Sequence, residues 1–121
     1  MTWEPALEEL RQRQALAREM GGPDKIARQH AAGRLTVRER IGTLLDAGSF
    51  HEIGSITGSG AYGETGALQS MTPTNFLFGR GRIEGRRVVV AGDDFTVRGG
   101  ASDASIIEKL VAAEQMAHEL R

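Results

Sequence analysis

The chain has 121 residues, of which 40% are hydrophobic and 26% are charged, and its formal net charge is -1. This balance is typical of one small soluble domain and argues against a general electrostatic attraction to nucleic acid or to an anionic membrane. The absence of cysteine excludes disulfides, thiolate nucleophiles and Cys-ligated zinc. No apolar run approaches the roughly 20 residues of a membrane span, and the first residues lack the pattern of a signal peptide. We therefore expect a cytoplasmic protein.

Three helices are predicted before the first strand. The first covers residues 5–20 and ends at Gly21-Gly22-Pro23, and the second covers residues 24–32 and ends at Gly33, where a positive φ is favoured. The third begins with Thr36-Val37-Arg38-Glu39, a capping box in which each terminal side chain bonds a backbone N–H of the other residue. The apolar faces expected of the first and third helices consist of Leu7, Leu10 and Ala17, and of Ile41, Leu44 and Leu45.

The pattern changes to that of strands from residue 50 onward. Residues 50–56 alternate loosely and predict one strand. Residues 75–83 and 87–91 predict two more, joined by a tight turn at Glu84-Gly85. The run Val88-Val89-Val90 lacks alternation, which favours a strand buried on both faces.

The segment between these strands, residues 57–74, is rich in glycine and is expected to form a long loop. Its run Gly58-Ser59-Gly60-Ala61-Tyr62-Gly63 matches the dinucleotide-binding pattern GxGxxG. That pattern holds a pyrophosphate only where a strand leads through it into a helix. Gly66 and Pro73 argue against a following helix, and we therefore favour a loop over a nucleotide site.

The strongest helix signal covers residues 102–120. Its wide apolar stripe consists of Ile106, Ile107, Leu110, Val111, Ala113, Ala117 and Leu120. A buried strand, a glycine-containing turn and a long amphipathic helix are the first parts of a β-α-β unit. Three strands offer little surface to cover such a stripe, so we expect a fragment or a chain that another chain completes.

Arginine side chains supply the first candidate binding groups. They form two clusters, Arg28, Arg34, Arg38 and Arg40 in the second and third helices, and Arg80, Arg82, Arg86 and Arg87 in the hairpin. One interpretation is a solvated surface. The other is a phosphate site, in which Arg34 and Arg38 flank the capped start of a helix.

Acidic, glycine and histidine residues leave further alternatives open. Asp93-Asp94 suits either a turn or paired carboxylates for acid–base or metal chemistry. Gly99-Gly100 suits either a plain turn or a pair of backbone N–H groups facing an oxyanion. The three histidines, His30, His51 and His118, lack ligand spacing, and no metal site is predicted.

Two long runs carry a family resemblance. One extends over residues 27–52 and includes Gly33-Arg34-Leu35-Thr36-Val37-Arg38-Glu39-Arg40, and the other extends over residues 81–102 and includes Asp94-Phe95-Thr96-Val97-Arg98-Gly99-Gly100. Together they resemble the N-terminal part of the carboxyltransferase (beta) subunits of biotin-dependent acyl-CoA carboxylases, of the propionyl-CoA and methylcrotonyl-CoA carboxylase type. The resemblance covers the chain from about residue 6 to its end.

The resemblance implies an α/β (α+β) fold. Residues 1–49 are expected to form an N-terminal helical segment, and residues 50–121 the first β-β-α units of a crotonase-like CoA carboxyltransferase N-terminal domain, apparently truncated. The full-length enzyme would move a carboxyl group from carboxybiotin to the α-carbon of an acyl-CoA, while this piece alone would be inactive. Arg34 and Arg38 are then expected to bind CoA phosphates, and the backbone N–H groups of Gly99 and Gly100 to be catalytic.

The same resemblance implies cofactors and partners. Biotin would be carried on a separate domain, acyl-CoA would be the substrate, and a biotin carboxylase or biotin carrier subunit and further copies of the full subunit would be partners. Nucleic acid, membrane and metal are not expected. Two alternatives stay open: a non-catalytic CoA- or partner-binding module, and a biotin-dependent decarboxylase subunit with the same fold.

Overall fold

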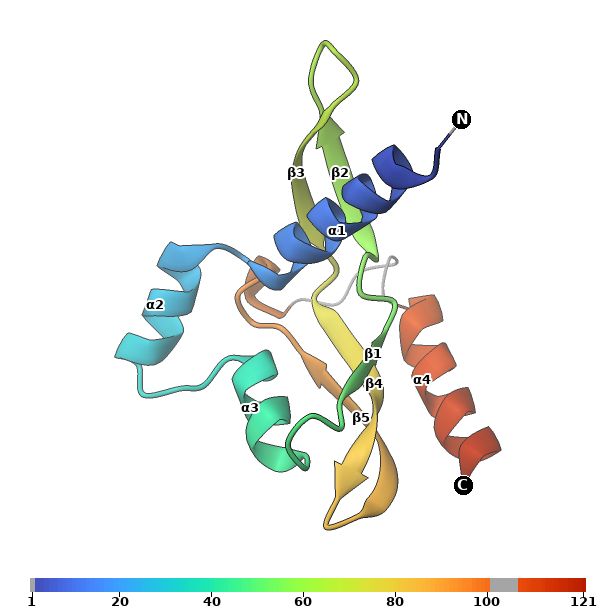
Figure 1. The fold of residues 1–121 in the computed structure, drawn as a ribbon. Coiled ribbons are helices and arrows are strands. Elements are labelled where there is room, and N and C mark those ends of the chain that lie inside the picture. The colour runs from blue at the N-terminus through green and yellow to red at the C-terminus, as the bar shows by residue number, and fades with distance from the viewer. Residues whose placement is uncertain (1, 101–106) are drawn as a thin grey trace.

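The computed structural model describes residues 2–100 and 107–121, to which every structural statement refers. The elements follow one another in the order shown in Figure 1. The helices are α1 (Glu4–Arg18), α2 (Pro23–Ala31), α3 (Val37–Leu44) and α4 (Ile107–Leu120), with a short 3-10 turn, η1 (Arg98–Gly100), before the last. The strands are β1 (His51–Ile53), β2 (Gly58–Tyr62), β3 (Leu68–Pro73), β4 (Phe76–Ile83) and β5 (Arg86–Asp93).

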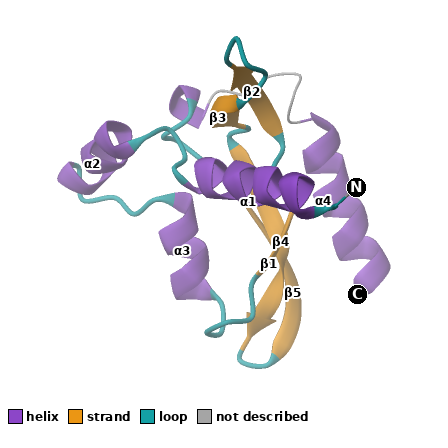
Figure 2. Ribbon diagram, turned by 45° about the horizontal axis from the view of Figure 1, so that its top comes forward, coloured by secondary structure: helices purple, strands orange, loops and turns teal. Residues whose placement is uncertain are grey.

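A three-stranded antiparallel sheet, in the order β1-β4-β5, separates two small cores. Helices α3 and α4 lie on its opposite faces (Figures 1 and 2). Successive residues of a strand point to opposite faces, so Leu77 packs with α3 while Phe76 and Phe78 pack with α4. No helix of the described residues is long and apolar enough to cross a membrane.

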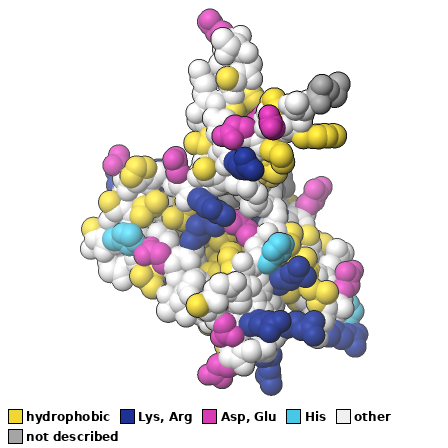
Figure 3. Space-filling view, in the orientation of Figure 1, with side chains coloured by type: hydrophobic (Ala, Val, Ile, Leu, Met, Phe, Trp, Pro, Cys, Tyr) yellow, Lys and Arg dark blue, Asp and Glu magenta, His cyan; other side chains and the backbone are white. Residues whose placement is uncertain are grey.

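Three short-range signals produce the local structures that they predict. Thr36 and Glu39 form the capping box, in which the Glu39 N–H donates to Thr36 Oγ1 at 3.2 Å and the Thr36 N–H donates to Glu39 Oε1 at 3.0 Å. Gly33 has a φ of 75° just beyond α2. Glu84 and Gly85 both have positive φ, as a tight turn between β4 and β5 requires, and the turn lies where basic side chains gather in Figure 3.

The prediction of a long loop at residues 57–74 is wrong, because these residues form the hairpin of β2 and β3. The hairpin is a separate two-stranded sheet that projects from the molecule, and α1 packs across it (Figure 1). Gln12 Nε2 donates to the Leu68 carbonyl at 3.0 Å, and the Arg13 guanidinium lies 5.5 Å from the centre of the Tyr62 ring. Strands pair through main-chain hydrogen bonds, so a hairpin can form without large apolar side chains. The packing that these glycine-rich strands lack comes from α1, which covers them.

The strand with three valines packs against a helix on each of its faces, as its composition predicts, but its valines are only half-buried. The central strand is β4, and β5 is an edge strand in the described part of the sheet. Val88 and Val90 pack toward α3 and Val89 packs toward α4, each half-buried. The valine run therefore indicates a strand that packs between two helices, not a strand that pairs with a neighbour on both sides.

The first strand is also shorter than residues 50–56, since β1 ends at Ile53. Gly54 follows it with a φ of 70°, and the Thr57 N–H and hydroxyl both donate to the Gly54 carbonyl. These contacts form a turn that ends the strand.

Several predicted apolar faces are covered only in part. Leu44 is 52% exposed while Leu45 is buried, because α3 ends at Leu44 and the chain becomes extended at Leu45. In α1, Ala17 is buried but Leu7 and Leu10 are exposed. Helix α4 contacts chiefly β4 and β5, so within its described stripe only Ala113 is buried. The start of this helix predicted at Ser102, including Ile106, lies outside the described residues.

Candidate functional site

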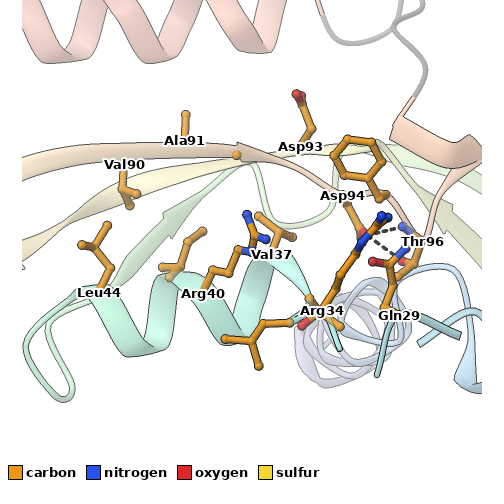
Figure 4. A pocket seen from close by; sticks show the side chains of 15 residues that line it. Gln29, Arg34, Val37, Arg40, Leu44, Val90, Ala91, Asp93, Asp94 and Thr96 are labelled. Carbon is orange, nitrogen blue, oxygen red and sulfur yellow. Dashed lines mark hydrogen bonds between the residues drawn. The ribbon is translucent and has the colours of Figure 1, made fainter. Parts of the chain in front are cut away.

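A cavity of about 540 Å³ lies between the start of α3 and the chain that leaves β5 (Figure 4). We call it the Arg34 cavity. Its polar side chains include Gln29, Arg34, Arg40 and Thr96, and its apolar wall includes Val37, Ile41, Leu44 and Val90. A cation beside an apolar wall suits a ligand with an anionic part and an organic part.

Arg34, which the sequence predicts to bind phosphate, lines this cavity with an exposed side chain. It lies in the connection between α2 and α3, directly after Gly33, whose positive φ turns the chain there. In Figure 4 its side chain extends toward the turn that carries Asp94 and Thr96. An exposed guanidinium can bind two oxygens of a phosphate or carboxylate at once.

Arg38 does not line this cavity, although the sequence places it beside Arg34. Its Nη1 donates to Glu52 Oε1 at 2.8 Å and its Nη2 donates to Glu52 Oε2 at 3.1 Å. The two side chains are only 22% and 12% exposed. Arg38 therefore joins α3 to β1 through a two-point ion pair, and the structure separates the two predicted phosphate ligands.

The start of α3 offers an anion fewer free N–H groups than the motif indicates. The backbone N–H groups of Thr36 and Glu39 are both used by the capping box. The hydrogen bond from His30, at 2.7 Å, and those from Thr36 lower the pKa of Glu39 from 4.5 to about 2. A carboxylate thus already occupies the positive end of the helix dipole.

Asp94 is a turn residue, and Asp93 and Asp94 do not form a pair of facing carboxylates. Asp94 is buried, and its Oδ1 accepts from the Thr96 N–H at 2.9 Å and from the Thr96 hydroxyl at 2.6 Å. Figure 4 shows the Asp93 side chain on the other side of the backbone. Across the described ranges, no cluster of three or more His, Asp or Glu side chains could hold a metal ion.

Gly99 and Gly100 lie in η1 with φ values of 59° and 75°, a conformation that favours glycine. The Gly100 N–H donates to the Val97 carbonyl at 3.0 Å, so it closes a turn in this structure. A Cβ at Gly100 would also lie 3.0 Å from the ring of Phe95. These contacts account for both glycines as turn residues, and their catalytic role stays a prediction.

Lys109 is the polar residue that the sequence reasoning missed. It is only 9% exposed on α4, and its Nζ donates to the Gly54 carbonyl at 3.1 Å and to Thr74 Oγ1 at 3.3 Å. Burial lowers the pKa of Lys109, and the charge of Arg38 lowers it further while that of Glu52 raises it. The one available signal was its spacing of four residues from Ala113, which puts both side chains on one helix face.

A sheet lies between helices, and the arginine-bearing cavity beside an apolar wall suits an anionic and partly apolar ligand. The chain belongs to the carboxyl transferase domain family, whose model matches residues 28–121. It is 36% identical to the propionyl-CoA carboxylase carboxyltransferase subunit of Haloferax mediterranei, over 99% of this chain and 23% of that protein. It is 34% identical to the methylmalonyl-CoA carboxyltransferase 12S subunit of Propionibacterium freudenreichii subsp. shermanii, over 96% of this chain and 22% of that protein.

Solved structures give the same result for the fold. The transcarboxylase 12S structure, a hexamer solved with methylmalonyl-CoA and methylmalonic acid bound, superimposes with a TM-score of 0.79 and 31% identity, over 96% of this chain and 23% of that chain. A single-chain, multi-domain long-chain acyl-CoA carboxylase superimposes with a TM-score of 0.76 and 28% identity, over 94% of this chain and 13% of that chain. The family resemblance and the crotonase-like α/β fold are thus confirmed. The chain spans less than a quarter of the length of these relatives.

Proposed function

We propose that the protein to which this chain contributes transfers a carboxyl group from carboxybiotin to the α-carbon of an acyl-CoA. The observation that carries the proposal is the match to carboxyltransferase subunits along 99% of the chain, together with the fold shared with the 12S structure. The biotin would be attached to a separate carrier domain, and a biotin carboxylase and further copies of the subunit would be partners. The site of action would be the cytoplasm.

In this proposal the Arg34 cavity binds the CoA part of the substrate. Arg34 and Arg40 are both exposed and would neutralise phosphate oxygens, while Val37 and Leu44 would contact apolar atoms of the ligand. Arg38 would act through Glu52 by holding α3 against β1, and it would not touch the phosphates.

The reaction itself needs charge stabilisation at the thioester. Loss of the α-proton places negative charge on the thioester oxygen, and fixed N–H donors lower the energy of that enolate. Carboxybiotin on its carrier would supply the carboxyl group to the α-carbon, and the biotin nitrogen released from that group would take up the proton lost by the α-carbon. Gly99 and Gly100 remain candidates for such donors, provided that the turn closed by the Gly100 N–H opens when the substrate binds.

Steady-state kinetics of the full-length protein, assayed with carboxylated biotin carrier, test this function. We expect acyl-CoA-dependent carboxyl transfer, and we expect Arg34→Ala to raise the KM for acyl-CoA about ten-fold, because a charge-assisted contact contributes roughly 1.5–3 kcal/mol. Arg11→Ala is the matched control, since Arg11 is a largely exposed arginine of α1. Binding of acyl-CoA without carboxyl transfer would instead support the non-catalytic module.

A further inference from the structure

The hairpin of β4 and β5 places several cations on one face of the central sheet. In the register of the sheet His51 faces Arg80, and Arg82 faces Arg87 directly across the β4–β5 ladder. Because side chains alternate along a strand, Arg80 and Arg82 share the face of Phe78, and Arg87 shares the face of Val89. All four residues therefore lie on the side that α4 covers, in the part of the sheet near its last turn.

A cavity of about 560 Å³ lies at this place. Its lining includes Arg80, Arg82, Arg87 and His51, and its apolar surface includes Phe50 and Leu120. We call it the hairpin cavity. It lies on the sheet face opposite to the Arg34 cavity, whose wall contains Val90 and the side chains of α3.

The arginines of the hairpin cavity form no ion pair with a carboxylate of the described residues. None of the ion pairs found among residues 2–100 and 107–121 includes Arg80, Arg82 or Arg87. The carboxylate of Asp46, which lies nearby, accepts from the backbone N–H groups of Glu84 and Gly85 in the turn. Like charges directly opposite each other on a ladder, such as Arg82 and Arg87, destabilise a sheet unless an anion lies between them.

We propose that the hairpin cavity binds a phosphate-bearing anion, a phosphate ester or a diphosphate. Each planar guanidinium can bind two oxygens of a phosphate, and three of them together suit a group with several negative oxygens. The apolar side chains Phe50 and Leu120 would contact the organic part of such a ligand. This site is additional to the Arg34 cavity and does not depend on the function proposed for it.

Calorimetric titration of the full-length protein with inorganic pyrophosphate, at fixed ionic strength, tests the site. We expect Arg82→Gln and Arg87→Gln each to weaken pyrophosphate binding about ten-fold or more. Arg86→Gln is the matched control, because it removes the same charge from the same hairpin, but Arg86 faces Ile83 on the other side of the sheet and does not line the cavity. Equal affinities for all three variants, or no binding by the unaltered protein, would overturn the proposal.

Thermal unfolding provides a second readout. Without pyrophosphate, Arg82→Gln should raise the Tm because it relieves the repulsion with Arg87, and with pyrophosphate it should lose most of the ligand-induced increase in Tm. A Tm increase by pyrophosphate that is identical in Arg82→Gln and in the unaltered protein would contradict the site.

Competition distinguishes two sources of the phosphate. If pyrophosphate inhibits carboxyl transfer competitively against acyl-CoA, and Arg82→Gln relieves this inhibition, the hairpin cavity rather than the Arg34 cavity holds phosphates of the CoA substrate. If pyrophosphate binds in the presence of saturating acyl-CoA, and Arg82→Gln weakens that binding, the hairpin cavity holds a separate phosphorylated effector. Either result supports a phosphate site at the hairpin.

Discussion

The backbone N–H of Gly21 donates to the hydroxyl of Thr96 at 2.9 Å, across 75 positions of the sequence. The same hydroxyl donates to Asp94 Oδ1 at 2.6 Å, so a buried carboxylate orients it. This contact fixes the junction of α1 and α2 against the turn that follows β5. The side of the Arg34 cavity formed by Thr96 is thereby positioned by a residue far from it in the sequence.

Gly21→Ala is expected to destabilise the protein strongly. A Cβ at this position would overlap the carbonyl oxygen of Thr96, and backbone atoms must move to make room. We expect a loss of about 1–3 kcal/mol or more in the free energy of unfolding, measured by urea denaturation. Gly42→Ala is the control: no atom lies within 4 Å of its Cβ, and alanine in a helix should add about 0.5–1 kcal/mol. Equal stability of the two variants would contradict the close approach.

Arg38→Ala should reduce stability more than substrate affinity. Its two-point ion pair with Glu52 is largely shielded from water, and removing one partner leaves the other charge half-buried. We expect each single variant to lose about 1–3 kcal/mol and the double variant with Glu52→Ala to lose less than the sum. The motif alone predicted a raised KM for acyl-CoA, and an Arg38→Ala protein of normal stability with a ten-fold higher KM would restore that interpretation.

Lys109 should make the protein more stable as the pH rises in the alkaline range. Its pKa is lowered in the folded state relative to the ordinary value of 10.5, chiefly by burial. Between the lowered pKa and 10.5 the unfolded chain binds more protons than the folded one, so the free energy of unfolding increases with pH in that window. Lys109→Met should remove this increase, whereas Lys25→Met, at an exposed position, should keep it. Urea midpoints at a series of alkaline pH values give the comparison.

Glu39 should stabilise the protein above its ordinary pKa and lose this effect in acid. Hydrogen bonds from His30 and Thr36 lower the pKa of Glu39 from 4.5 to about 2 in the folded state. Its contribution is therefore fully present above pH 4.5 and disappears as the pH falls toward about 2. The stability difference between the unaltered protein and Glu39→Gln should shrink over this interval. Glu64→Gln, at an exposed position in the β2–β3 hairpin, should differ little from the unaltered protein at any pH of the series.

Local structures that depend on a few neighbouring residues could be predicted from the sequence. The capping box of Thr36 and Glu39 and the turn at Glu84-Gly85 each depend on neighbours within three positions, so composition and spacing suffice to predict them. The family was readable as well, because the matching runs are long and ordered.

Contacts between segments far apart in the chain could not be predicted from the sequence. The ion pair of Arg38 with Glu52 joins residues 14 positions apart on different elements, and no local pattern distinguishes it from an exposed arginine beside a helix start. The burial of Lys109 depends on carbonyl and hydroxyl groups of two loops more than 30 positions away. Of the two arginines predicted to bind phosphate, Arg34 therefore lines a cavity, whereas Arg38 holds α3 against β1.

The hairpin of β2 and β3 has a further consequence through its attachment to α1. An isolated two-stranded sheet is marginally stable in water, and here Gln12 and Arg13 of α1 contact Leu68 and Tyr62 of the hairpin. The amide protons of the hairpin can therefore exchange with solvent whenever α1 detaches. Residues 4–18 and 58–73 should behave as one cooperative unit in hydrogen exchange, although the central sheet keeps its protection.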